Sequence, residues 1–230
     1  MLGRDSYEFG IEGRDNPSNA YNFGFDIKQN FAKANFRYEL DERHTLQFGI
    51  NTLQYQLSPG SIAPEGPESI VVPKTVSQEQ AFETAIFLGD DFEVNDKLTV
   101  NYGARYVFYS FVGPNTVNLY QEGVPRSPAS LIGERTYGSG ETIQSYSGPE
   151  FRISGRYAIN NISSVKLGYN TNRQFIHLLT NNAAIAPTDI WKLSDPHIKP
   201  QWGDQISLGY YRNFKVDKYE FSVEAYHRNM

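Results

Sequence analysis

The chain has 230 residues, a formal charge of −5 and no cysteine, which excludes a disulfide framework, a thiol nucleophile and a cysteine-ligated zinc site. No apolar run reaches the roughly 18 residues of a membrane helix, and the negative charge disfavours a nucleic-acid partner. Aromatic residues nevertheless make up 14% of the sequence, while the mean hydropathy is −0.53. The aromatic side chains therefore lie either in a soluble core or on an outer surface.

Two-residue alternation of apolar and polar side chains recurs from about residue 31 to the end of the chain. A segment at 5–13 has Tyr7, Phe9 and Ile11 in the same spacing, with an unclear register. Within 80–94, Asp90 interrupts the apolar face. The eight strands predicted by the alternation are 27–40, 45–56, 80–94, 98–112, 146–159, 163–174, 204–214 and 218–228.

Each predicted strand has one apolar and one polar face. The polar faces carry Arg105, Arg156, Lys166 and Glu220, as expected for a wet lumen or for one filled by a plug. The aromatic residues predicted on the apolar, lipid-side face are Tyr102, Tyr106, Phe108, Tyr169, Tyr210, Tyr219 and Phe221.

The connections between predicted strands alternate in length. Short turns lie at 41–44, 95–97, 160–162 and 215–217, and long loops at 57–79, 113–145 and 175–203. In an up-and-down meander all short turns fall at one end of the sheet, as in outer-membrane barrels. The strands also match the roughly 9–11 residues that a tilted strand needs to cross a bilayer. These features predict an all-β, antiparallel transmembrane β-barrel of up-and-down hairpins, although a soluble β-sandwich also alternates.

Three segments resemble the barrels of TonB-dependent outer-membrane receptors. Residues 194–201 (SDPHIKPQ), running into 204–210 (DQISLGY), are similar to a loop end that feeds a strand in that family. Departures from the family pattern are Asp195, Gln201 and Ser207, where asparagine, glutamate and glutamate are commoner. Residues 88–106 (LGDDFEVNDKLTVNYGARY) look like a hairpin of such barrels, with Asp90 at an acidic position, and 224–229 (EAYHRN) look like a later strand.

The resemblance implies that residues 1–230 are part of the receptor's barrel domain, with about 8–9 strands of a larger barrel. The resemblance implies a plug domain upstream, so we expect no plug domain in this chain. We also expect no signal peptide, because the first residues lack an apolar leader. The implied location is the bacterial outer membrane. The implied function is energised, high-affinity uptake of a scarce solute such as a siderophore, corrinoid, glycan or peptide.

The implied partners are outer-membrane lipid, a small solute bound by external loops, TonB and the plug of the full-length protein, and a surface lipoprotein. Two membrane alternatives stay open: a complete eight-stranded anchor or adhesin barrel, and a passive porin. The soluble β-sandwich binding module is the third alternative.

Catalytic chemistry has little support in the sequence. The histidines His44, His177, His197 and His227 are scattered and form no metal-ligand pair. Asp195 and His197 could form a triad with a serine, but the sequence has no nucleophile elbow. It also has no P-loop and no dinucleotide fingerprint. We therefore predict no enzyme, no cofactor, and no catalytic or metal residue.

The third long loop contains an apolar group that offers the best starting point for recognition. Trp191 can stack on a sugar ring or an aromatic siderophore. A structural cluster of Ile185, Ile190, Trp191 and Leu193 is the preferred interpretation, so ligand-binding residues stay unknown.

Overall fold

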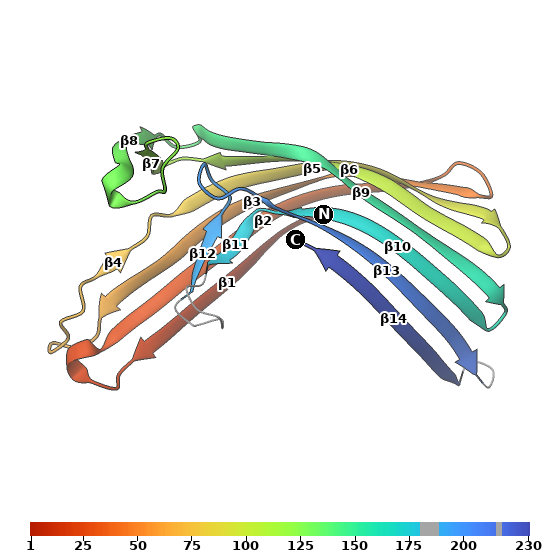
Figure 1. The fold of residues 1–230 in the computed structure, drawn as a ribbon, viewed down its shortest axis with the longest axis horizontal. Helices are drawn as coiled ribbons and strands as arrows, with labels where there is room; N and C mark the ends of the chain where they lie inside the picture. The colour runs from red at the N-terminus through yellow and green to blue at the C-terminus, as the bar shows by residue number, and fades with distance from the viewer. Residues whose placement is uncertain (180–188, 215–217) are drawn as a thin grey trace.

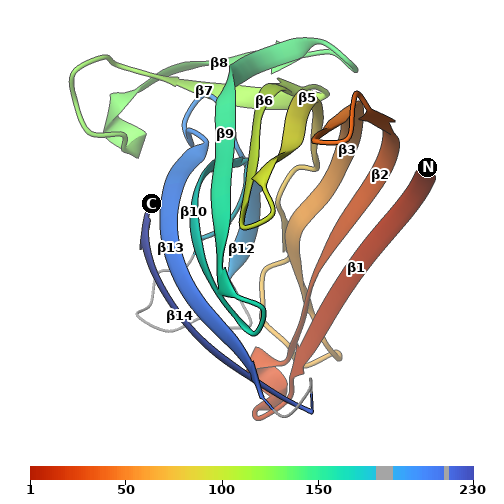
Figure 2. The same ribbon diagram turned by 90° about the vertical axis from the view of Figure 1, so that its right-hand side faces the viewer.

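The computed structural model describes residues 1–179, 189–214 and 218–230. Nine long strands form one antiparallel sheet, in which each long strand pairs with the next in the chain. The sheet curves into an open trough (Figures 1 and 2). Its nine long strands are β1 (Leu2–Gly13), β2 (Tyr21–Glu39), β3 (His44–Pro64), β5 (Glu79–Asn95), β6 (Leu98–Val112), β9 (Thr142–Asn160), β10 (Ser163–Gln174), β13 (Gln201–Phe214) and β14 (Tyr219–Asn229).

This arrangement confirms the predicted all-β, up-and-down architecture. All eight predicted strands are present, and β1 settles the register of 5–13 by pairing Phe9 with Phe25. The two edge strands, β1 and β14, do not pair with each other in the described part of the chain, so the sheet is a partial barrel. A sandwich of two packed sheets is not the observed fold.

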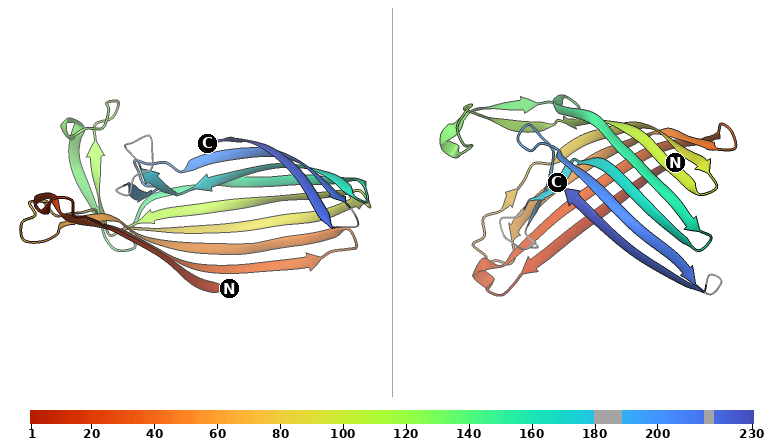
Figure 3. Two further views of the ribbon diagram at one scale, coloured as in Figure 1. Left: turned by 90° about the horizontal axis from the view of Figure 1, so that it is seen from below. Right: turned by 45° about the vertical axis from the view of Figure 1, so that its right-hand side comes forward.

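The two ends of the trough differ as the turn lengths predicted (Figure 3). Short turns join β2 to β3, β5 to β6 and β9 to β10 at one end, whereas the long connections lie at the other. The predicted turn at 215–217 and the loop residue Ile185 lie outside the described residues. No helix in the described ranges is long and apolar enough to span a membrane.

The long loops contain regular structure that the sequence did not predict. One hairpin, β7–β8, projects from the rim, and another, β11–β12, folds into the trough (Figures 1 and 2). The small elements are η1 (Pro17–Asn19), β4 (Lys74–Thr75), β7 (Asn115–Tyr120), η2 (Pro128–Ser130), β8 (Leu131–Tyr137), β11 (Ile176–Leu179) and β12 (Ile190–Leu193).

The short turns are closed by side chains that hydrogen-bond to nearby backbone. Asp41 accepts hydrogen bonds from the N–H groups of Arg43 and His44, both at 2.8 Å. These bonds lower the pKa of the Asp41 carboxyl. Asn95 accepts from Lys97 and Leu98 in the same way, at 3.0 Å. Such Asx turns reverse the chain within a few residues and fix the register of the hairpins.

The outer face of the sheet is apolar in the half nearer the short turns. Phe36, Leu88 and Leu208 are 56%, 57% and 53% exposed there, although each is large and apolar. Tyr102, Tyr106, Phe108, Tyr169, Tyr219 and Phe221 are exposed as well. A contiguous exposed apolar surface of this kind indicates contact with lipid. The predicted outward placement is therefore confirmed for these six residues, whereas the seventh, Tyr210, is half-buried.

Toward the loops the outer face of the sheet becomes polar and the inner face becomes apolar. On β3 the outward residues become Gln54 and Gln56, while Tyr55 and Leu57, on the inner face, are 6% and 1% exposed. The 21 residues of β3 extend about 70 Å at ~3.3 Å per residue, more than twice the ~30 Å of a hydrocarbon core. The apolar outer band thus crosses the membrane, and the loop-side half stands in water with its core inside the trough.

Asp90 lies on the lipid-side face rather than outside the strand pattern. Its Oδ2 contacts the Nδ1 of His44 at 2.6 Å and accepts a hydrogen bond from the Tyr102 hydroxyl at 2.9 Å. The His44 ring stacks on Phe92, with ring centroids 4.2 Å apart. Asp90 is consequently only 6% exposed, and its neighbours allow a carboxyl group in the apolar band.

Candidate functional site

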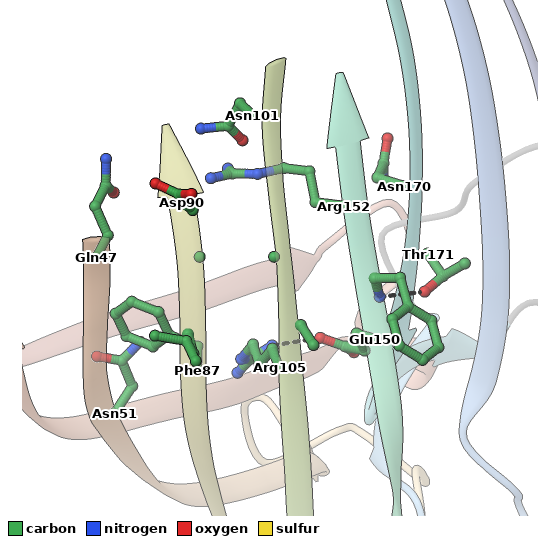
Figure 4. Close-up of a pocket in the computed structure, with 15 residues that line it drawn as sticks. Gln47, Asn51, Phe87, Asp90, Asn101, Arg105, Glu150, Arg152, Asn170 and Thr171 are labelled. Carbon is green, nitrogen blue, oxygen red and sulfur yellow. Dashed lines mark hydrogen bonds and ion pairs between the residues drawn. The ribbon is translucent and has the colours of Figure 1, made fainter. Parts of the chain in front are cut away.

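A ladder of charges lies on the inner wall of the membrane-crossing half (Figure 4). Arg105 on β6 bonds to Glu83 on β5 at 2.9 Å and to Glu150 on β9 at 2.8 Å. The Glu150 side chain is only 7% exposed, and its second oxygen accepts the backbone N–H of Arg173 at 2.7 Å. One guanidinium thereby joins three strands, because its two terminal nitrogens donate to carboxylates on different neighbours.

A hollow of about 380 Å³ lies beside this ladder. Its floor is the cross-strand pair Gly89 and Gly103, at which the two backbones approach closely. A Cβ atom at Gly103 would lie 3.0 Å from the carbonyl oxygen of Leu88, so only glycine fits without a shift. The wall therefore has a recess between its larger polar side chains.

Two polar residues that line the hollow hold a neighbouring carboxylate. Asp91 accepts hydrogen bonds from the side-chain amides of Gln47, at 2.5 Å, and Asn101. Arg152, opposite Gly103, points across β6 (Figure 4) and forms no ion pair with any residue in the described ranges. This surface can bind anions or hydrogen-bonding groups from within the barrel.

Replacing Arg105 with glutamine is expected to destabilise the barrel by about 1–3 kcal/mol, because two largely buried carboxylates lose their cation. The measurement is the thermal midpoint of the full-length receptor, followed by the migration of folded and unfolded barrel on a gel. Arg152→Gln is the matched control, since Arg152 is exposed, and its midpoint should change little. Equal shifts in both variants would show that the ladder does not stabilise the wall.

The β11–β12 hairpin is anchored to the sheet by a buried charge cluster. Glu79 at the start of β5 is 2% exposed, pairs with Lys192, and accepts the N–H of Leu193 at 2.8 Å. Asp195 adds a second carboxylate at 3.1 Å from the Lys192 ammonium. Burial lowers the pKa of Lys192, but the attraction of both carboxylates outweighs it and leaves the pKa raised. Lys192 therefore stays charged.

Two tyrosines extend this anchor into the following loop. The Tyr109 hydroxyl donates to the carbonyl of Ser194 at 2.8 Å, and the Tyr146 hydroxyl donates to that of Asp195 at 2.7 Å. The Tyr109 ring also stacks on Phe175, with centroids 4.4 Å apart. Burial raises the pKa of Tyr109, so the hydroxyl remains a donor.

Apolar packing covers the same contacts. Leu193 is 0% exposed and belongs to one core with Tyr55, Leu57 and Phe111, and Trp191 packs against that core. The structure places two members of the predicted apolar cluster, Trp191 and Leu193, against the sheet itself. These two residues of the third long loop thus pack inward against the sheet.

A second hollow, of about 540 Å³, lies between this hairpin and strands β1 and β2. Its lining includes the aromatic residues Tyr7, Phe9, Phe25 and Trp191. We call it the aromatic groove. It lies on the inner face of the loop-side half, above the apolar outer band.

The residues considered for catalysis are placed in structural roles. Asp195 accepts the backbone N–H groups of His197 and Ile198, both at 2.7 Å, which shapes the turn at Pro196. The His197 ring contacts the carbonyl of Asn118 at 3.0 Å instead of the Asp195 carboxylate. Within the described ranges no group of three or more acidic or histidine residues could hold a metal ion.

Sequence reasoning missed the anchor residue Glu79 and the partners of Arg105. Glu79 and Lys192 are separated by 113 positions, and neither stands in a recognisable motif. The alternation of apolar and polar residues placed Arg105 on the polar face of its strand. It could not identify Glu83 and Glu150 as the partners of Arg105. Only the observed register brings these groups together.

Comparison with known proteins gives one family. The model described as TonB dependent receptor-like, beta-barrel matches residues 3–230. No curated protein matches the sequence. The family match covers nearly the whole chain and agrees with the open up-and-down sheet, its apolar outer band and its polar inner wall. The chain belongs to the TonB-dependent receptor β-barrel family.

Proposed function

We propose that residues 1–230 form part of the barrel wall of an outer-membrane receptor that imports a scarce solute by energised transport. The proposal is carried by one observation: the same membrane-crossing strands present apolar residues outward and a charged wall inward. Such a wall separates lipid from a wet or protein-filled interior. Membership of the TonB-dependent receptor family supports the direction of transport and the outer-membrane location.

The full-length protein would supply the other parts needed for transport. A plug domain would fill the barrel against the inner wall, where Arg152 and the recess over Gly89 and Gly103 offer polar contacts. TonB would deliver energy from the inner membrane. The external loops would bind the solute, and the exposed Ile132 on the β7–β8 hairpin offers an apolar contact for a surface lipoprotein. In this scheme the chain catalyses no reaction and uses no cofactor.

The test is uptake of the receptor's solute by whole cells that express the full-length protein. A protonophore should abolish concentrative uptake while leaving surface binding intact, because energy is needed for passage and not for capture. Uptake that continues unchanged after the protonophore would indicate the passive porin. Absence of any uptake or binding by a correctly inserted barrel would indicate the anchor or adhesin alternative.

A further inference from the structure

A hollow of about 550 Å³ lies on the lipid-side face of the sheet, where β5, β6 and β9 run side by side. We call it the outer hollow. Gly89 and Gly103 line both this hollow and the recess on the inner wall, so the two lie on opposite sides of one glycine pair. The large side chains of its lining that follow the outward register are Leu46, Leu88, Tyr102, Phe151 and Ile153. Because the outer hollow opens on hydrocarbon, components of the membrane are the molecules that reach it.

The outer hollow exists because one small residue interrupts a cross-strand row of large ones. The row is Phe36, Phe48, Leu88, Ala104 and Phe151. Phe36 and Phe48 fill their part of the row by stacking, with ring centroids 5.4 Å apart. Ala104 has only a methyl group to place between Leu88 and Phe151, and the glycine pair beside it has no side chain. An apolar chain lying in this gap gains dispersion contacts that the protein itself does not make.

The neighbouring row, on the short-turn side, marks the border of the membrane. Its members are Tyr38, Leu46, Asp90, Tyr102, Ile153 and Tyr169. Three tyrosines in one row are typical of the aromatic girdle at a membrane–water interface. Asp90 is paired with Leu46, which lies two residues, or about 7 Å, from the start of β3. The outer hollow therefore has a polar end at the interface and an apolar end toward the bilayer centre.

Asp90 at the polar end has an oxygen that lacks a donor. His44 and Tyr102 both contact Oδ2, whereas Oδ1 is buried and has no hydrogen-bond partner among the residues that the structure describes. Leaving a buried carboxyl oxygen without a donor costs free energy. Arg152 is the other charged residue of the lining, but its side chain lies along the inner wall (Figure 4). A donor arriving from the membrane side would satisfy Asp90.

From these observations we propose that the outer hollow binds a phospholipid with a primary-amine headgroup, phosphatidylethanolamine, from the leaflet next to the short turns. One acyl chain lies over Ala104, between Leu88 and Phe151, and the ammonium group donates a hydrogen bond to Asp90. The polar and apolar ends of the site thus match those of the lipid. The inference concerns the outer face of the wall and does not depend on the proposed uptake function.

Lipid titration of the purified full-length receptor in detergent tests the proposal. The probes are phosphatidylethanolamine and phosphatidylcholine with the same acyl chains, and native mass spectrometry gives the dissociation constant of the first lipid bound. Both headgroups are zwitterionic, but only ethanolamine has N–H donors. We expect phosphatidylethanolamine to bind at least about tenfold more tightly. Equal affinities for the two lipids would overturn the proposal.

Ala104→Leu tests the apolar end of the site. The larger side chain fills the gap, so both lipids should bind about tenfold more weakly. Ala34→Leu is the matched control, because Ala34 is also an exposed alanine in the outward register but does not line the outer hollow. This control should bind both lipids as wild type does. Equal affinity in wild type and Ala104→Leu would refute the outer hollow as the lipid site.

Asp90→Asn tests the polar end of the site. The substitution removes the charge and nearly keeps the shape, so the preference for phosphatidylethanolamine should fall to about threefold or less, while phosphatidylcholine binds as before. Migration as a folded barrel on a gel checks each variant. An unchanged preference would contradict the contact with Asp90. If the receptor purifies as a dimer that excludes lipid from this face, a second copy occupies the outer hollow and the proposal fails.

Discussion

Replacing Leu208 with arginine is expected to block or strongly weaken assembly of the receptor in the membrane. Leu208 lies on the outer face of β13, 53% exposed, between Leu167 on β10 and Ala225 on β14. A guanidinium at this point would stand in hydrocarbon, at a cost of about 2–4 kcal/mol near the bilayer midplane. The measurement is the fraction of full-length receptor that migrates as folded barrel, together with its unfolding in denaturant.

The adjacent residue provides a matched control. Ser207 points into the trough and is paired with Gly168 and Tyr226, so an arginine there has room and can reach water. Ser207→Arg should therefore assemble nearly as well as wild type. If Leu208→Arg also assembled normally, or if Ser207→Arg were the more damaging variant, the outer face of the sheet could not be the lipid surface.

This comparison also shows why the membrane-crossing half was predictable from sequence. On β6 every second residue from Leu98 to Phe108 is apolar, and the structure places that whole set on the outer face. Lipid on one side and water or polar protein on the other impose a strict period of two. On β5, Asp90 is the exception to this period of two. Its carboxyl group is tolerated on the outer face because His44 and Tyr102 bond to it.

The loop-side extensions could not be predicted in the same way, because the apolar residues change face along a continuous strand. On β2 the outward apolar residues Phe36 and Tyr38 have even numbers, whereas the inward Phe23 and Phe25 have odd numbers. Where the apolar residues change from odd to even positions, the sequence pattern looks the same as the end of one strand. The predicted strand therefore began at residue 27, although β2 begins at Tyr21.

The candidate site depends on contacts that no local pattern encodes. The aromatic groove joins Tyr7 and Phe25 to Trp191, and the anchor joins Glu79 to Lys192. The prediction singled out Trp191 as a member of a cluster but had no register with which to place Phe25 beside it. Sheet pairing and the inward fold of the third loop supply that information.

Replacing Glu79 with alanine is expected to release the β11–β12 hairpin from the sheet. The substitution leaves the largely buried Lys192 ammonium with Asp195 as its one remaining carboxylate and removes the acceptor of the Leu193 N–H. Removing one partner of a buried ion pair costs about 3–5 kcal/mol. The measurement is hydrogen exchange in the full-length receptor, in which the amide of Leu193 should exchange about a hundredfold faster or more. The strand amides of β5 and β6 should remain protected, because the backbone hydrogen bonds between the barrel strands are unaffected.

A double variant shows whether charge or packing holds the hairpin. In Glu79→Gln with Lys192→Met, the glutamine oxygen can still accept the Leu193 N–H. The Asp195 carboxylate loses Lys192 but keeps the hydrogen bonds from the N–H groups of His197 and Ile198. Protection should then return close to the wild-type value, as apolar replacements of buried ion pairs often do. If Glu79→Ala alone kept full protection, the packing of Leu193 and Phe175 would be sufficient.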